Sequence, residues 1–298
     1  MKLLCTAFLF FSVNCKILLF VVFSCLSFAC KPKPNGPKFS LANVDSLLVK
    51  NTFTASNNLK LPYRFFEPNI KQQKKIPLVI FLHGRGERGT ENGERIYRNA
   101  GFLMNENSLL TTKSQEKYPC YVLVPQCSDK TENEEWAKWI GNKPETPFKG
   151  LGKDGSYQIN PIPSDSGKAT LELIEKLIKE KAIDTSRIYI TGLSMGGFGT
   201  WDFIARKPNL FAAAIPMAGY SDPNQIQKIK EIPIWIFHGN KDQWNPVEGS
   251  RNMYQLLKNI NADVKYTEYN LGHRDTFKKA FKEPELISWM FSKSKKIK

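Results

Sequence analysis

The sequence predicts an α/β protein with a mostly parallel central sheet and helices on both faces. Strand-like apolar runs alternate with helical patterns along the second half of the chain, which is typical of parallel strands joined by helices. One strand-to-helix junction carries a serine between two glycines. The 298 residues, 41% of them hydrophobic, suffice for the core of a single large domain.

The predicted elements follow one another without repeats or low-complexity blocks. Strand-like runs occupy 61–67, 76–82, 121–124, 187–191, 212–218, 232–237 and 264–269. Helical patterns with one apolar face occupy 170–181, 254–260 and 284–291. The stretch 128–166 is too long for an ordinary connection, so we expect an insertion there that leaves the sheet at the functional edge.

Ser194 is the first candidate for covalent catalysis. Gly192-Leu193-Ser194-Met195-Gly196 follows the apolar run 187–191 and precedes the helix-like stretch 198–206. This is the strand, turn and helix context of a nucleophile elbow, whose strained turn needs glycine on both sides of the serine. The alternative is an ordinary serine in a tight turn, so the pattern needs support from the rest of the chain.

That support comes from the histidines, of which the chain has three: His83, His238 and His273. Serine hydrolases on α/β sheets order their triad as Ser, Asp or Glu, then His. His273 alone follows Ser194 with an intervening acid, Asp242, at the end of its own strand. The carboxyl ends of parallel strands meet at one edge, so we expect the three side chains to converge there. His273 would be the base and Asp242 its orienting carboxylate.

Each of these assignments has an alternative. Asp222 and Glu248 compete with Asp242 for the role of the acid. His83 and His238 both precede glycine at strand ends, where a structural histidine that bonds loop backbone is expected more often than a catalytic one.

The oxyanion of the tetrahedral intermediate needs preorganised backbone N–H donors. The residue after the nucleophile, Met195, supplies one. We expect the second from the loop that follows strand 77–82, at Arg85, with Gly86 as the alternative.

The same loop, 84–89, also fits the dinucleotide fingerprint G-x-G-x-x-G. We reject that interpretation for two reasons. Glu87 would place a carboxylate beside the pyrophosphate, and no second strand ending in an acid appears about 20 residues on. The sequence also holds no Cys and His spacing of a metal site, so no cofactor or metal and no nucleic-acid partner is expected.

The N-terminus predicts export. Residues 3–29 are almost wholly apolar, and their second half has the length of a signal-peptide core. Cys30, or alternatively Cys25, follows small residues and is a candidate for the lipidated residue of a cell-envelope lipoprotein. The predicted organisation is a leader over 1–30, a linker over 31–40 and a catalytic domain over 41–298. Simple cleavage to a secreted or periplasmic protein is the alternative.

The two cysteines outside the leader, Cys120 and Cys127, flank a short strand. An extended segment of that length separates its ends by about 20 Å, too far for a disulfide, so free buried thiols are expected. The net charge of +15 predicts a basic surface. The simplest interpretation of this charge is a solvated surface. The more specific alternative is a surface that lies against acidic glycans or the cell envelope.

The bulky aromatics of the insertion, Trp136 and Trp139, together with Trp244 near the acid, are candidates for a substrate-binding wall. The insertion's tryptophans fit a small local core equally well.

These motifs resemble those of secreted α/β-hydrolases, a group of predicted peptidases and esterases of the feruloyl, acetyl-xylan and polyhydroxybutyrate-depolymerase type. The resemblance spans about residues 60 to 291 and is carried by 83–89, 125–127, 186–201, 238–242 and 272–273. One departure is Asn245, where relatives usually have an apolar residue. The resemblance implies an esterase acting on a small ester or acylated glycan, with a peptidase as the alternative. A non-catalytic binding lipoprotein would be expected to lack triad members.

Overall fold

The computed structural model describes residues 41–69, 74–105, 108–129, 139–141 and 158–295. Within them the strands form one sheet in the order β1-β2-β4-β3-β5-β6-β7-β8. The edge strand β1 (Val49–Thr54) pairs antiparallel with β2 (Lys60–Phe66), and β2 also runs antiparallel to β4. The remaining strands are parallel: β3 (Ile76–Leu82), β4 (Tyr121–Pro125), β5 (Ile183–Leu193), β6 (Ala213–Met217), β7 (Ile234–Gly239) and β8 (Val264–Tyr269). The predicted fold class is confirmed.

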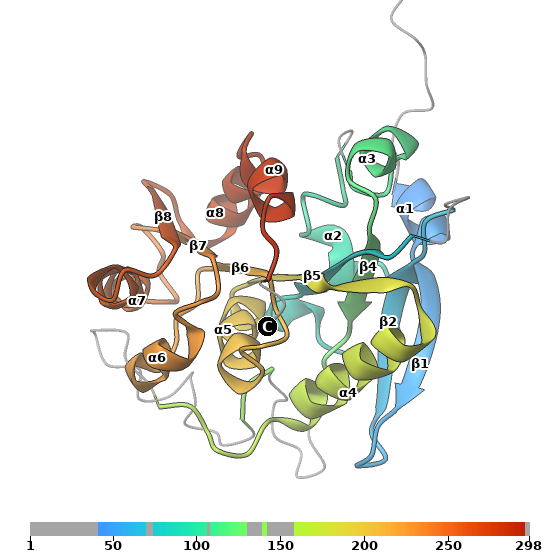
Figure 1. Ribbon diagram of the computed structural model, residues 1–298, viewed down its shortest axis with the longest axis horizontal. Coiled ribbons are helices and arrows are strands. Elements are labelled where there is room, and N and C mark those ends of the chain that lie inside the picture. The colour runs from blue at the N-terminus through green and yellow to red at the C-terminus, as the bar shows by residue number, and fades with distance from the viewer. Residues whose placement is uncertain (1–40, 70–73, 106–107, 130–138, 142–157, 296–298) are drawn as a thin grey trace, which may run out of the picture. The chain divides into compact units, whose positions relative to one another are not determined.

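Helices cover both faces of this sheet (Figure 1). One face carries α4 (Asp165–Glu180), α5 (Met195–Arg206), α6 (Ile226–Ile229) and α7 (Val247–Asn259). The other carries α1 (Leu41–Leu47), α2 (Arg95–Arg98), α3 (Thr112–Lys117), α8 (His273–Ala280) and α9 (Leu286–Phe291). Two short 3-10 helices, η1 (Arg85–Glu87) and η2 (Pro223–Gln225), follow β3 and β6.

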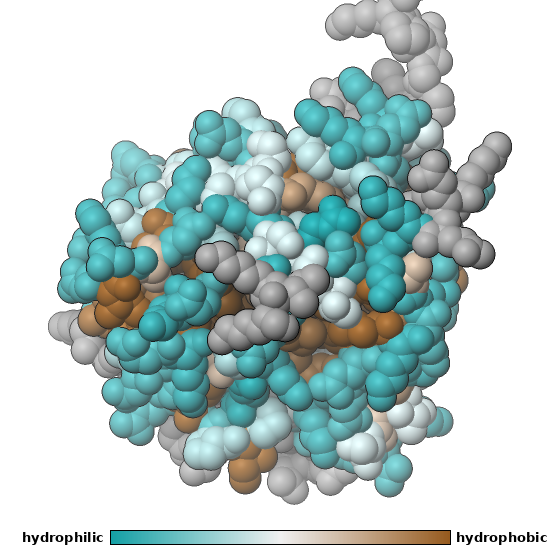
Figure 2. Space-filling model, viewed as in Figure 1, coloured by the Kyte–Doolittle hydropathy of each residue, from teal (hydrophilic) through white to brown (hydrophobic). Residues whose placement is uncertain are grey.

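The core consists of two apolar layers, one on each side of the sheet. The central strand β3 contributes to both, with Leu78 and Ile80 in one layer and Val79 and Phe81 in the other. A strand buried on both faces is a continuous apolar run, which is why the sequence pattern located β3 so clearly. Figure 2 shows hydrophilic side chains over the helices and apolar residues in a band between them.

Cys120 and Cys127 lie buried at the two ends of β4 as free thiols, which confirms the sequence prediction. Burial raises the pKa of both to about 12, so neither is a thiolate at neutral pH. The predicted leader over 1–30 and most of the insertion lie outside the described residues. Among the residues that are described, no helix is long and apolar enough to cross a membrane.

Candidate active site

Ser194 occupies the sharp turn between β5 and α5. Its backbone has φ 54° and ψ −117°. Residues other than glycine adopt such a positive φ only at a cost in conformational free energy. The turn is held by the Ser194 N–H, which donates to the Met217 carbonyl at 2.9 Å. The elbow therefore stores strain that places the serine side chain at the carboxyl end of the sheet.

The flanking glycines allow the close packing of this turn. A Cβ atom on Gly196 would lie 1.9 Å from the carbonyl oxygen of Leu82 at the end of β3. One on Gly192 would lie 2.3 Å from the Gly196 carbonyl oxygen. Both contacts are with backbone that cannot move aside, so these two positions require glycine.

The three residues that the sequence singled out lie in a hydrogen-bonded chain. His273 Nε2 is 2.8 Å from Ser194 Oγ, and His273 Nδ1 is 2.5 Å from Asp242 Oδ2. They come from the turns after β5 and β7 and from the first residue of α8, which follows β8. His273 is 2% exposed, so its ring is largely shielded from competing water. The arrangement leaves Nε2 free to accept the Ser194 proton while Nδ1–H donates to the carboxylate.

Asp242 is fixed by four donors. The backbone N–H groups of Trp244 and Asn245 both donate to Oδ1 at 2.9 Å. His238 Nε2 approaches Oδ2 at 3.3 Å, on the same oxygen that His273 contacts. Burial alone would raise the pKa of Asp242, but the hydrogen bonds from the two histidines and from Asn245 outweigh it and hold the pKa well below its usual range. The carboxylate is therefore ionised at neutral pH.

The competing acids lie elsewhere. Asp222 accepts from the N–H groups of Ile159 at 3.0 Å and Asn224 at 2.9 Å, and so caps η2. Glu248 pairs with Arg251 on the surface of α7 at 3.4 Å. Of the three candidate acids, Asp242 is the one that contacts His273.

His238 is fully buried beneath Asp242. Its Nδ1 is 2.7 Å from Ser250 Oγ, which in turn lies 3.2 Å from the Gly219 carbonyl oxygen, and its Nε2 is also 3.1 Å from the Asn245 carbonyl oxygen. The Asn245 carbonyl is a loop-backbone partner of the kind predicted for His238, whereas the contact with Asp242 was not predicted. The spacing of four residues between His238 and Asp242 was the one feature of the sequence that could have indicated this contact.

The loop after β3 lies beside the elbow. A Cβ on Gly84 would lie 2.8 Å from Leu193 Cδ1. The backbone at Gly84 therefore packs against Leu193, the residue that precedes Ser194 in the sequence. Arg85 and Gly86 follow in η1 and are exposed, and Met195 begins α5. Among the described residues, no hydrogen bond uses the backbone N–H of Met195 or Arg85. The assignment of these groups to an oxyanion hole remains a prediction.

His83 holds this loop in place. Its Nδ1 is 2.7 Å from the Gly84 carbonyl oxygen, and its Nε2 accepts from the Cys127 N–H at 3.0 Å. Those partners require a proton on Nδ1 and a lone pair on Nε2, hence a neutral ring. Burial lowers the pKa of His83 to about 4, in keeping with that state.

Protonation of His83 should therefore weaken the fold as the pH falls. The folded-state pKa lies below the unfolded value of about 6.5, so the stabilisation is present above pH 6.5 and is lost as the pH falls toward 4. We expect this residue to account for about 2 kcal/mol of the stability lost between pH 7 and pH 5. Urea unfolding of wild type and His83→Gln at both pH values measures it. An equal pH slope in the two proteins would contradict the assignment.

The predicted substrate-binding tryptophans are placed differently from one another. Trp244 is 59% exposed, and its ring lies 5.0 Å from the His273 ring. Trp139 is fully buried instead: it donates from Nε1 to the His83 carbonyl oxygen at 2.9 Å and packs edge-on against the His83 ring. For Trp139 the structure favours the second of the two alternatives that the sequence left open, a side chain in a local core, because its ring is buried under the loop after β3. Trp136 lies outside the described residues.

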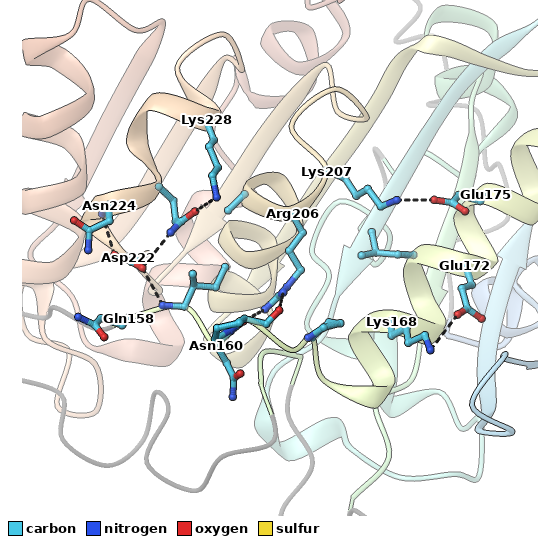
Figure 3. Close-up of a pocket in the computed structure, with 16 residues that line it drawn as sticks. Gln158, Asn160, Lys168, Glu172, Glu175, Arg206, Lys207, Asp222, Asn224 and Lys228 are labelled. Atoms are coloured by element: carbon cyan, nitrogen blue, oxygen red, sulfur yellow. Dashed lines mark hydrogen bonds and ion pairs between the residues drawn. The ribbon is translucent and has the colours of Figure 1, made fainter.

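A cavity of about 800 Å³ lies away from these residues, between α4, the end of α5 and the segment after β6 (Figure 3). Of its charged side chains, Lys207 pairs with Glu175 at 2.9 Å, and Arg206 pairs at 2.6 Å with the buried Asp202, which does not line the cavity. None of Ser194, Asp242 and His273 lines it.

Comparisons with known proteins find a family model and an esterase that are similar to parts of this chain. Residues 167–273 match the model of the prolyl oligopeptidase family. Acetylxylan esterase A of Emericella nidulans is 32% identical over 107 residues, which are 34% of this chain and 31% of that protein. The chain thus spans about a third of this relative's length.

Solved structures extend the likeness to most of the chain. A thermostable esterase superposes with a TM-score of 0.72 and 34% identity, over 85% of this chain and 64% of the other. An acylaminoacyl peptidase from Pyrococcus horikoshii superposes with a TM-score of 0.54 and 18% identity, over 83% of this chain and 41% of the peptidase. At this identity the likeness shows the fold alone. The chain therefore has the α/β-hydrolase fold and is similar in sequence to esterases, and its residues 167–273 match the prolyl oligopeptidase family.

Proposed function

We propose that this chain is an exported serine hydrolase that cleaves carboxylic esters through an acyl-enzyme intermediate on Ser194. The observation that carries the proposal is the hydrogen-bonded chain from Ser194 through His273 to Asp242 at the carboxyl edge of the sheet. The apolar leader supports export, with a lipid anchor at Cys30 as the expected attachment.

In the first half of the reaction, Ser194 Oγ attacks the ester carbonyl carbon while His273 Nε2 takes the hydroxyl proton. The imidazolium that forms is stabilised by the ionised Asp242. Backbone N–H groups of Met195 and Arg85 bind the oxyanion of the tetrahedral intermediate. When the intermediate collapses, the bond to the alcohol oxygen breaks and His273 returns the proton to the leaving alcohol.

In the second half, water replaces the alcohol. His273 takes a proton from the water as its oxygen attacks the acyl carbon, and then gives that proton to Ser194 Oγ as the acid leaves. His238 contacts Asp242 Oδ2, the oxygen that His273 also contacts, and so helps to keep the carboxylate oriented throughout the cycle.

The relatives favour an ester over a peptide substrate, because the curated protein and the thermostable structure at about a third identity are both esterases. The family match over 167–273 favours the alternative, a peptidase or amide hydrolase that would share the triad. A panel of p-nitrophenyl esters, acetylated and feruloylated sugars and peptide anilides separates the two. Greater kcat/KM on the esters supports the proposal, and greater kcat/KM on the anilides contradicts it.

We propose that Trp244 is the substrate-binding residue on the acid side of the site. Its exposed ring beside His273 offers a stacking surface for an aromatic or sugar ring. Trp244→Ala should raise KM roughly tenfold for a feruloyl or glycosidic ester, and less for p-nitrophenyl acetate, which is too small to reach the ring. Trp244→Phe, which keeps an aromatic face, is the matched control. Equal losses on large and small esters would show that the ring acts on the geometry of His273 instead.

A further inference from the structure

Arg85 and Arg274 differ from the other arginines of the chain in what their guanidinium groups contact. Most of the others are paired with a carboxylate: Arg64 with Asp45, Arg95 with Glu91, Arg98 with Glu94, Arg187 with Asp184, Arg206 with Asp202 and Arg251 with Glu268. Arg88 donates to the Arg85 carbonyl oxygen. In the described part of the chain, the guanidinium groups of Arg85 and Arg274 have neither an ion pair nor a hydrogen bond, and both residues are exposed.

These two residues flank the candidate active site. Arg85 follows Gly84, whose backbone lies against Leu193, the residue before Ser194. Arg274 directly follows His273, and its guanidinium carbon lies 5.7 Å from the centre of the Trp244 ring. That cation–π contact restrains the Arg274 side chain on the exposed face of the site. The two unpaired arginines thus belong to the two segments beside Ser194: the loop after β3 and the start of α8.

The carboxylates near them are engaged elsewhere. Glu87 in η1 accepts from Asn99, and burial raises its pKa, against the opposing effect of Arg95 and Arg274. Asp275 bonds Lys278 at 3.1 Å. Glu87 and Asp275 are therefore not paired with Arg85 or Arg274, and the net charge of +15 adds a general attraction for anions.

We infer that Arg85 and Arg274 bind a carboxylate carried by the ester substrate. A planar guanidinium donates in parallel to both oxygens of a carboxylate, which gives such a contact both strength and orientation. The carboxylate belongs either to the acyl part, as in a dicarboxylic half ester, or to the alcohol part, as in an acylated uronic acid. This inference rests on the proposed esterase function and names the substrate class for the same site.

Matched pairs of substrates test it. To test a carboxylate on the alcohol part, hydrolysis of 4-acetoxybenzoate is compared with that of the neutral 4-acetoxybenzamide. To test a carboxylate on the acyl part, hydrolysis of mono-p-nitrophenyl adipate is compared with that of p-nitrophenyl hexanoate. The uncatalysed rates are subtracted in both comparisons. We expect the wild type to prefer the anionic member of at least one pair by about tenfold in kcat/KM, and the preference to shrink as NaCl is added. Arg85→Gln and Arg274→Gln should each reduce that preference severalfold.

Lys279→Gln is the control, because it removes one exposed positive charge from the same helix, α8, outside the site. It should keep the wild-type preference. An anionic-to-neutral ratio near or below one in both pairs would overturn the inference, as would a ratio that the two arginine variants leave unchanged.

Binding measurements separate this inference from the proposed function. Ser194→Ala protein, which retains the arginines, is titrated calorimetrically with intact 4-acetoxybenzoate and 4-acetoxybenzamide. Tighter binding of the anion, lost in the double variants with Arg85→Gln or Arg274→Gln, supports the carboxylate site even if turnover is absent. Equal binding of the two esters contradicts it. Failure of the wild type to hydrolyse any ester contradicts the esterase function alone.

Discussion

Replacing Ser194 by alanine should reduce kcat for ester hydrolysis by at least about 10⁴-fold, because the substitution removes the nucleophile itself. The fold should persist. Alanine keeps the Cβ at this position, and the turn is held by backbone hydrogen bonds from Ser194 to Met217 and from Phe198 to Ser194, which do not involve the hydroxyl. Steady-state kinetics together with thermal unfolding measure both effects.

Ser221→Ala is the matched control for this variant. Ser221 is buried like the elbow, and its Oγ has no hydrogen-bond partner among the described residues. Its replacement should leave kcat within about twofold, because no bond is lost. Near-full activity of Ser194→Ala would exclude the acyl-enzyme mechanism.

Replacing His273 by alanine should be about as damaging as replacing Ser194, since nucleophile and base act as a unit. Asp242→Asn should cost roughly tenfold to a hundredfold less, because the acid orients and stabilises the base without touching the substrate. An amide at this position accepts poorly where it now receives two imidazole donors, so the orientation of His273 is degraded rather than removed. Single-turnover kinetics of the three variants on one ester give the comparison.

The other histidines are the controls. His83→Ala and His238→Ala should act through stability or through the geometry of Asp242, and their losses should be accompanied by lower unfolding temperatures. If His238→Ala abolished activity while His273→Ala left kcat near wild type, the ordering of Ser194, Asp242 and His273 along the chain would have named the wrong base.

The parallel strands and the elbow were predictable because each is encoded locally. β3 and β7 are continuous apolar runs, and the glycines around Ser194 mark a turn that no other residue type can form. β1 escaped prediction because Val49–Thr54 is an edge strand whose burial alternates only between exposed and half-buried positions, so it lacks an apolar signature. Packing against β2 determines its structure, and that contact is not visible in its own residues.

In the candidate site, too, some features are encoded locally and others depend on tertiary contacts. The chain order of Ser194, Asp242 and His273 and the strand before each were enough to place them at one edge of the sheet. Their neighbours were not predictable in this way. The burial of Trp139 depends on the space between His83 and Phe203, and the contact of His238 with Asp242 depends on how the loop after β7 turns. Both are three-dimensional contacts that residue type alone leaves open.

Covalent labelling of the intact protein with a fluorophosphonate, followed by peptide mass spectrometry, tests directly whether Ser194 is the activated serine. The nucleophile proposed here predicts one phosphonyl group per chain, located on Ser194, and no labelling of the Ser194→Ala or His273→Ala variants on the same time scale. Attachment of the label at any other residue, or stoichiometric labelling of the Ser194→Ala variant, would contradict the claim that Ser194 is the activated serine.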